Sequence, residues 1–225
     1  MIAAIQGEDV RVSLQVAGLA TLLCVAFGLP LAWLLARHRF PGRSLLEVAV
    51  TLPLVLPPTV VGYYLLRALG RGSPAGRFLE DDLGISVVFT WYGAALAAAI
   101  VSIPFLIRTA QAAFEAVDPE LERVAQTLGR SRIGVFRAIT LPLAARGIAA
   151  GVALAFARAI GEFGATVVLA GNIPGKTRTL PISVYDAVQA GDIDRANVTA
   201  LFLIGISLIS LLVFGWSLLL VRRQV

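Results

Sequence analysis

The stretch VVFTWYGAALAAAIVSIPFLIRTAQA, residues 87–112, decides the fold of this chain. It carries a single charged side chain, Arg108. The hydrocarbon core of a bilayer is ~30 Å thick and takes about 20 apolar residues in helical form. In lipid, a continuous apolar segment satisfies its backbone hydrogen bonds internally only as a helix. The stretch is therefore expected to cross a membrane.

Four further apolar runs of similar length flank this stretch. The expected spans are residues 10–36, 46–69, 87–112, 143–170 and 196–221. The ten-residue alternation of porin-type barrels does not appear in these runs. The sequence predicts an all-α fold, a polytopic membrane protein with about five transmembrane helices, organised as one transmembrane domain over residues 1–225.

Composition excludes several other classes of protein. A chain with 58% hydrophobic and 15% charged residues and a mean hydropathy of +0.84 is not a soluble globule. Its net charge of +5 comes from short basic clusters between apolar runs, without an aromatic-basic stripe, so nucleic-acid binding is not expected. Cys24 and His38 are single residues of their types, which predicts no disulfide framework and no metal site. Glu8 and Asp9 stand where a signal peptide has basic residues, so the first helix is expected to stay in the membrane.

The distribution of basic residues between alternate loops predicts the orientation. One side collects eleven of them: Arg37, Arg39, Arg43, Arg108, Arg123, Arg130, Arg132, Arg137, Arg146, Arg222 and Arg223. The other side collects seven: Arg11, Arg67, Arg71, Arg77, Lys176, Arg178 and Arg195. Positive residues concentrate on the cytoplasmic side of a membrane protein. The C-terminus and the 113–142 loop are thus expected in the cytoplasm and the N-terminus outside; the family resemblance described below implies the inner membrane of a bacterial cell.

The 113–142 loop has the pattern of two short helices. Asp118 and Pro119 are typical of a helix start. Gly129 is typical of a helix end, and Ser131 of a second start. Apolar residues recur at helical spacing in both segments: Leu121, Val124, Ala125 and Leu128, then Ile133, Phe136 and Ile139. Periodicity alone leaves two uses open, lying on the bilayer surface or docking in a groove of a partner.

The spacing in this loop resembles the EAA loop by which permease subunits of ABC importers engage their ATPase. Ala125, Gly129 and the Ile-x-Leu-Pro end stand in register, whereas Arg123 and Val124 occupy the Glu-Ala positions and the nearest acid is Glu122. The resemblance implies a coupling site made of Glu122, Arg123, Ala125, Leu128, Gly129, Ile139, Leu141 and Pro142. It also implies a lever mechanism, in which two partner ATPases close around ATP and pull the loop. The chain itself is then not an enzyme and holds no cofactor, because ATP and Mg²⁺ bind to the ATPase.

Two other segments narrow the resemblance. Residues 170–177, AGNIPGKT, fit a loose phosphate-loop pattern, but they follow a membrane span instead of a strand, so ATP binding is not expected. Residues 162–181 and 52–64 instead resemble molybdate permeases. The implied architecture is the type I importer permease core, with molybdate or its analogue tungstate as substrate and an external binding protein as partner. Sulfate or thiosulfate permeases are the nearest rivals, and a secondary transporter or a membrane scaffold are more distant alternatives.

Five residues are candidates for the transport pathway. Pro57 and Pro58 interrupt the second span beside Thr59, which fits either a kinked pathway helix or an ordinary kink repaired by neighbours. Arg158 and Glu162 lie four residues apart near the middle of the fourth span, where pairing is expected. Arg158 then either contacts the anion transiently or forms a structural clamp, and the clamp is the preferred hypothesis.

The size of the chain predicts its assembly. Five helices are few to enclose a path for a hydrated dianion, so a homodimer with the pathway between two copies is expected. Gly147 and Gly151 form a GxxxG pattern that allows close helix approach. Residues 180–191 are expected to form a short interfacial helix near the outer mouth.

Overall fold

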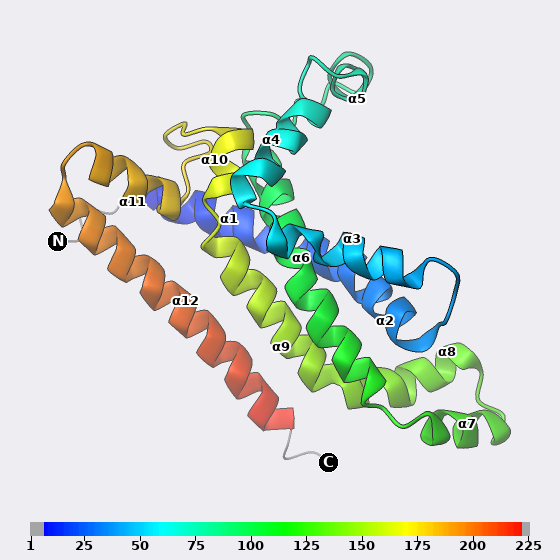
Figure 1. The fold of residues 1–225 in the computed structure, drawn as a ribbon. Helices are drawn as coiled ribbons and strands as arrows, with labels where there is room; N and C mark the ends of the chain where they lie inside the picture. Colours follow the sequence, from blue (N-terminus) through cyan, green and yellow to red (C-terminus); the bar gives the residue numbers. More distant parts are fainter. Residues whose placement is uncertain (1–6, 222–225) are drawn as a thin grey trace.

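The computed structural model describes residues 7–221, which form helices joined by turns and loops and contain no strand. Four helices are long and apolar enough to cross a membrane, and a bent pair gives a fifth candidate span. The long helices pack along one another (Figure 1). The predicted all-α membrane fold is confirmed.

The first span wraps against the central helix α6. It runs from Gly7 to Arg37 as α1 (Gly7–Leu23), a π-helical turn (Cys24–Gly28) and α2 (Leu29–Arg37). Its partner α6 (Trp91–Glu115) carries the largest share of buried residues among the span candidates. A Cβ atom on Gly28 would lie 3.1–3.3 Å from side chains of α6. The glycine therefore permits the close approach of these two helices.

The second span is broken, and not merely kinked as we predicted for residues 46–69. Helices α3 (Arg43–Val55) and α4 (Pro58–Leu69) meet at 112°. Leu56 and Pro57 between them have extended backbone, with ψ angles of 139° and 131°. Proline disfavours helical geometry in the residue before it and lacks an N–H group, so two consecutive prolines end α3 and begin α4.

The fourth span also differs from the predicted continuous helix over residues 143–170. One long helix runs from Arg132 to Ile160, through α8 (Arg132–Val135), a π-helical turn (Phe136–Thr140) and α9 (Leu141–Ile160). The second short helix of the loop is thus continuous with the span, because the wider π turn accommodates Pro142. Residues 161–163 then break the helix before α10 (Gly164–Ala170).

Helices α6 and α9 form the tightest contact of the core. A Cβ atom on Gly147 would lie 2.3 Å from the Cβ of Ala113, and one on Gly151 would lie 3.0 Å from Leu106. The predicted GxxxG close approach therefore occurs inside one chain, between α9 and α6.

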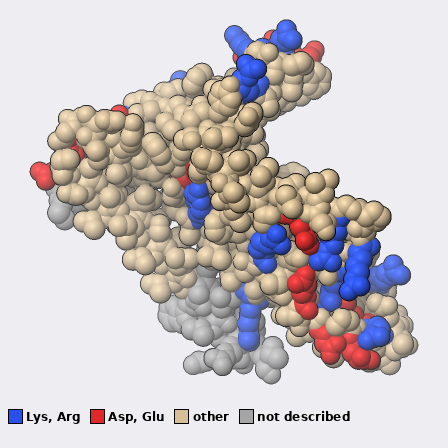
Figure 2. Space-filling view, in the orientation of Figure 1, with Lys and Arg blue, Asp and Glu red and all other residues tan. Residues whose placement is uncertain are grey.

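The shorter elements lie at the two ends of the helices. Helix α7 (Pro119–Thr127) lies with α8 at one end, and α11 (Leu180–Gln189) precedes the last span α12 (Ile193–Val221) at the other (Figure 1). A separate projection carries α5 (Pro74–Arg77) and a π-helical turn (Phe78–Asp82). Charged side chains gather around α7 and α8 and at the tip of this projection, and the body between them is largely uncharged (Figure 2). Arg222 and Arg223 of the charge count lie outside the described residues, and the orientation stays a prediction.

Candidate functional site

Helix α7 has the local structure that its sequence predicts. The Asp118 carboxylate accepts a hydrogen bond from the Glu120 amide at 2.8 Å, and Pro119 occupies the first helical position. At the other end Gly129 has a φ of +85°, a conformation that a side chain would strain. The Ser131 hydroxyl then accepts a hydrogen bond from the Gly134 amide at 3.1 Å and begins α8. The predicted coupling segment, residues 113–142, therefore contains a helix and a sharp glycine turn at the end of a membrane span.

The apolar face of α7 points outward. Leu121, Val124 and Leu128 are 49%, 52% and 79% exposed, whereas Ala125 is buried against the protein. Ile133 of α8 is also exposed. An exposed apolar surface is typical of an interaction site. It fits both uses that periodicity left open, lying on the bilayer surface and docking on a partner.

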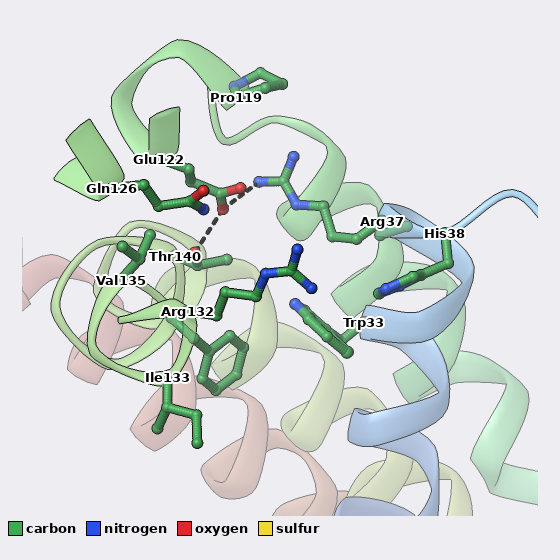
Figure 3. Close-up of a pocket in the computed structure, with 12 residues that line it drawn as sticks. Trp33, Arg37, His38, Pro119, Glu122, Gln126, Arg132, Ile133, Val135 and Thr140 are labelled. Atoms are coloured by element: carbon green, nitrogen blue, oxygen red, sulfur yellow. Dashed lines mark hydrogen bonds and ion pairs between the residues drawn. The ribbon is translucent and has the colours of Figure 1, made fainter. Parts of the chain in front are cut away.

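The opposite face of α7 is held by Glu122. One carboxylate oxygen, Oε1, lies 2.9 Å from Nη2 of Arg37 and accepts a hydrogen bond from the Thr140 hydroxyl at 2.5 Å (Figure 3). Arg37 Nη2 also donates to the carbonyl oxygen of Val117 at 3.1 Å. A charge-assisted contact of this kind is directional and stronger than a neutral hydrogen bond. Glu122 thus joins α7 to the end of α2 and to the start of α9.

Sequence reasoning missed Arg37 and Thr140 as members of this site. Arg37 entered the sequence analysis only as a charge that sets topology, and it lies 85 residues from Glu122 along the chain. The one available signal was the position of Arg37 at the end of a span on the same predicted side as the loop.

A cavity of about 690 Å³ lies beside this ion pair. Its walls come from the end of α2 and from the coupling segment, as Figure 3 shows. The ring of His38 packs edge-on against Trp33 with centroids 5.0 Å apart, and Trp33 packs in the same way on Phe136 at 5.7 Å. His38 therefore makes a structural aromatic contact at this point.

The remaining residues of the predicted coupling site lie on both sides of the glycine turn. Arg123 is exposed on α7 and pairs with Glu120 at 3.2 Å. Ile139 lies in the π-helical turn, and Leu141 and Pro142 are the first residues of α9. The structure thus places the predicted set along one continuous segment that ends in a membrane span.

The candidate pathway residues meet where the second and fourth spans are broken. A Cβ atom on Gly164, at the start of α10, would lie 3.2 Å from side-chain atoms of Pro58 and Thr59. A Cβ atom on Gly62 of α4 would lie 2.7 Å from the carbonyl oxygen of Ala165. The backbones of α4 and α10 therefore pack directly against each other. Pro57 and Thr59 remain exposed at this junction.

We predicted that Arg158 and Glu162 lie near the middle of a continuous helix, and this prediction is wrong. Arg158 lies in the last turn of α9, and Glu162 lies in the break that follows it. Their side chains pair at 2.6 Å, and Glu162 is only 1% exposed. The second carboxylate oxygen of Glu162 accepts the Ala165 amide at 2.7 Å. Both oxygens of this buried carboxylate are thereby satisfied, which is the geometry of a clamp across the break.

The phosphate-loop pattern of residues 170–177 forms a surface loop after α10. Thr177 is buried, and its hydroxyl accepts the amide of Ile173 at 3.1 Å. The carboxylate of Glu8 lies so close to Gly175 that a Cβ atom there would be 2.5 Å from it. An anionic side chain against the glycine of the pattern opposes phosphate binding, because the two negative charges repel. The loop is fixed instead by Arg178, which pairs with Asp186 of α11 at 2.9 Å.

Comparison with known proteins gives one family. Residues 28–225 match the model of the binding-protein-dependent transport system inner membrane component. The molybdenum transport system permease protein ModB of Escherichia coli (strain K12) is 48% identical over 210 residues, which cover 93% of this chain and 92% of the relative. The sulfate transport system permease protein CysT of Salmonella typhimurium is 41% identical over 201 residues, with coverage of 89% and 72%.

Solved structures share the fold. A bacterial ABC transporter involved in the import of the acidic polysaccharide alginate has a chain with a TM-score of 0.76 at 18% identity, covering 96% of this chain and 79% of that chain. The MetNI methionine ABC transporter in inward-facing conformations has one with a TM-score of 0.71 at 16% identity, covering 95% and 94%.

Proposed function

This chain belongs to the family of binding-protein-dependent transport system inner membrane components, and from that premise we propose that it is the membrane-spanning permease subunit of an ATP-driven importer that translocates molybdate, with tungstate as an analogue. The observation that carries the proposal is the exposed apolar face of α7, held at the end of a span by the Gly129 turn. High identity to molybdenum permeases over most of both chains supports the substrate.

The partners follow from the same proposal. The apolar face of α7 is the surface on which a cytoplasmic ATPase dimer docks, and ATP is hydrolysed there and not in this chain. A substrate-binding protein delivers the oxyanion at the opposite face, near α11. A related fold has been solved with its periplasmic protein, which supports a partner of this kind. The enrichment in Lys and Arg supports an orientation with α7 and the C-terminus in the cytoplasm and the N-terminus on the other side of the inner membrane.

The pathway is proposed to lie between two copies of the chain. The junction of the broken spans leaves Pro57, Thr59 and Gly161 exposed. Irregular backbone at membrane depth is tolerated where it borders protein or a water-filled cavity, not lipid. A homodimer that turns these junctions toward each other encloses them, and the Arg158–Glu162 clamp keeps each junction in shape.

Uptake of labelled molybdate into vesicles tests the proposal. The vesicles hold this chain, its ATPase and its binding protein, and ATP is either supplied inside or withheld. We expect ATP-dependent uptake that excess tungstate suppresses and excess sulfate does not. Gly129→Asp serves as the uncoupled control, because aspartate strains the left-handed turn that presents α7.

A sulfate permease is the second candidate, and the 41% identity to a sulfate permease supports it. Equal suppression of uptake by sulfate would keep the ABC mechanism and move the substrate to sulfate. Uptake that does not depend on ATP would overturn the role of α7 and favour a secondary transporter.

A further inference from the structure

The inference starts from how Arg37 ends the first span. Its guanidinium is 14% exposed and contacts both sides of the turn that leads into α7, the Val117 carbonyl and the Glu122 carboxylate. A single side chain of the first span thereby fixes where α7 begins and how it is oriented.

Helix α7 is not adjacent to the first span along the chain. Helix α7 follows α6 through three residues, 116–118, and reaches α9 through the Gly129 turn and α8. A displacement of α7 is thus passed along the chain to α6 and α9. The first span is more than 80 residues away in sequence, and Arg37 supplies its polar contacts with the coupling segment.

The apolar contacts near Arg37 do not set the orientation of α7 relative to the first span. The α2–α6 packing and the Trp33–Phe136 contact join the same segments. Apolar association is non-directional, so such surfaces can slide while staying buried. The ion pair, in contrast, requires both distance and angle, and a shared oxygen on Glu122 ties it to Thr140 at the start of α9.

We propose that Arg37 is a positioning residue that transmits the movement of α7 to the first span. The inference rests on the proposed function, since it assumes that an ATPase moves α7. With the link intact, α1 and α2 move together with α6 and α9 when the ATPases close. Without it, α7 still docks through its apolar face, but the first span follows only through its apolar packing on α6.

The experiment measures uptake and ATP hydrolysis together in the reconstituted complex. In Arg37→Gln we expect the molybdate taken up per ATP hydrolysed to fall by about fivefold or more, the usual range of coupling between distant sites. The complex assembles and hydrolyses ATP, because the apolar face of α7 is intact. A purely structural role would lower uptake and hydrolysis in proportion and leave their ratio unchanged. Glu122→Gln keeps an oxygen for the Thr140 hydroxyl but removes the charge that pairs with Arg37, and it should lower the ratio as well.

Arg43→Gln is the matched control. Arg43 lies at the same end of the molecule, pairs with Glu47 at 2.9 Å on its own helix and lies 3.7 Å from Glu115 at the end of α6. It therefore joins α3 to α6 and forms no ion pair with α7. We expect the wild-type ratio for this variant.

Each outcome decides one question. An unchanged ratio in Arg37→Gln overturns the inference and leaves the proposed function standing. If Arg37→Gln does not assemble, Glu122→Gln decides: a lowered ratio supports the inference, and an unchanged ratio overturns it. A wild-type complex without ATP-dependent uptake instead contradicts the proposed function itself.

Discussion

At the scale of single residues, the carboxylate of Glu162 is buried and depends on two partners. Arg158 satisfies one of its oxygens and the Ala165 amide the other. A buried charge that loses its partner is costly, whereas replacing both members of a pair by neutral groups is often tolerated. This asymmetry gives a test of the clamp.

Arg158→Gln is expected to lower the free energy of unfolding by about 1–3 kcal/mol, because it leaves Glu162 buried without its partner. Arg158→Gln combined with Glu162→Gln should recover most of the loss, since a glutamine oxygen still accepts the Ala165 amide. Thermal unfolding in detergent measures both. A double variant as unstable as the single one would contradict the clamp.

Uptake by the same single variant tests the alternative role of Arg158. If Arg158 contacts the passing anion, Arg158→Gln abolishes uptake in complexes that still assemble. Retained uptake excludes that contact and leaves the clamp as the role of the pair.

A second ion pair predicts a pH dependence outside the membrane. The hydrogen bond from Arg71, together with its positive charge, holds the pKa of Glu80 below its ordinary value. A lowered carboxyl pKa stabilises the paired state above the ordinary pKa, and this stabilisation is lost as the pH falls through the lowered value. The protection factor of amide hydrogen exchange in residues 70–82, which corrects for the intrinsic slowing of exchange in acid, should therefore fall at low pH. Glu80→Gln should show the lower protection factor already at neutral pH, and a wild-type protection factor that does not change with pH would refute the pair.

At the scale of elements, local sequence signals predicted the helices of the coupling segment, but its non-local contacts could not be predicted from the sequence. Asp118, Gly129 and Ser131 act on backbone groups within a few residues, so their roles follow from sequence spacing. The ion pair of Glu122 with Arg37 joins segments 85 residues apart and depends on how the spans pack. Spacing along the chain holds no information on that packing.

The broken helices show the same division. The Pro57–Pro58 pair predicted an interruption, but its 112° angle depends on α4 lying against α10. The break at residues 161–163 was missed, because the small apolar residues around Glu162 give the same hydropathy in a straight span as in two packed halves.

The exposed face of α7 leads to a prediction for ATPase binding. Leu121→Ser removes an apolar side chain from the docking surface without opening a cavity. We expect about tenfold or more weaker binding of the ATPase, the cost of losing one buried leucine at an interface. The stability of the isolated permease should not change. Leu83→Ser is the control, since Leu83 is 54% exposed on the projection at a distance from α7; equal weakening in both variants would argue against a docking face.

At the scale of the whole molecule, the orientation in the membrane awaits measurement. Cys24 is buried, so a Cys24→Ser background gives a chain without thiols. A membrane-impermeant maleimide should label Ser73→Cys in intact spheroplasts, because residues 70–90 are predicted outside. It should label Ser131→Cys only after permeabilisation. The reverse pattern would invert the topology and move α7 away from the ATPase.

The broken second span has a consequence for the lipid around the protein. Helix α3 has 13 residues, which at 1.5 Å per residue gives about 20 Å, shorter than the ~30 Å hydrocarbon layer. The exposed leucines and valines along α3 are nevertheless more stable in contact with lipid or protein than with water. The resulting hydrophobic mismatch is relieved where the bilayer thins or a second copy shields the helix. The thickness of the membrane should therefore affect how α3 is accommodated in the bilayer, and the acyl-chain length of the lipids is the means of changing that thickness.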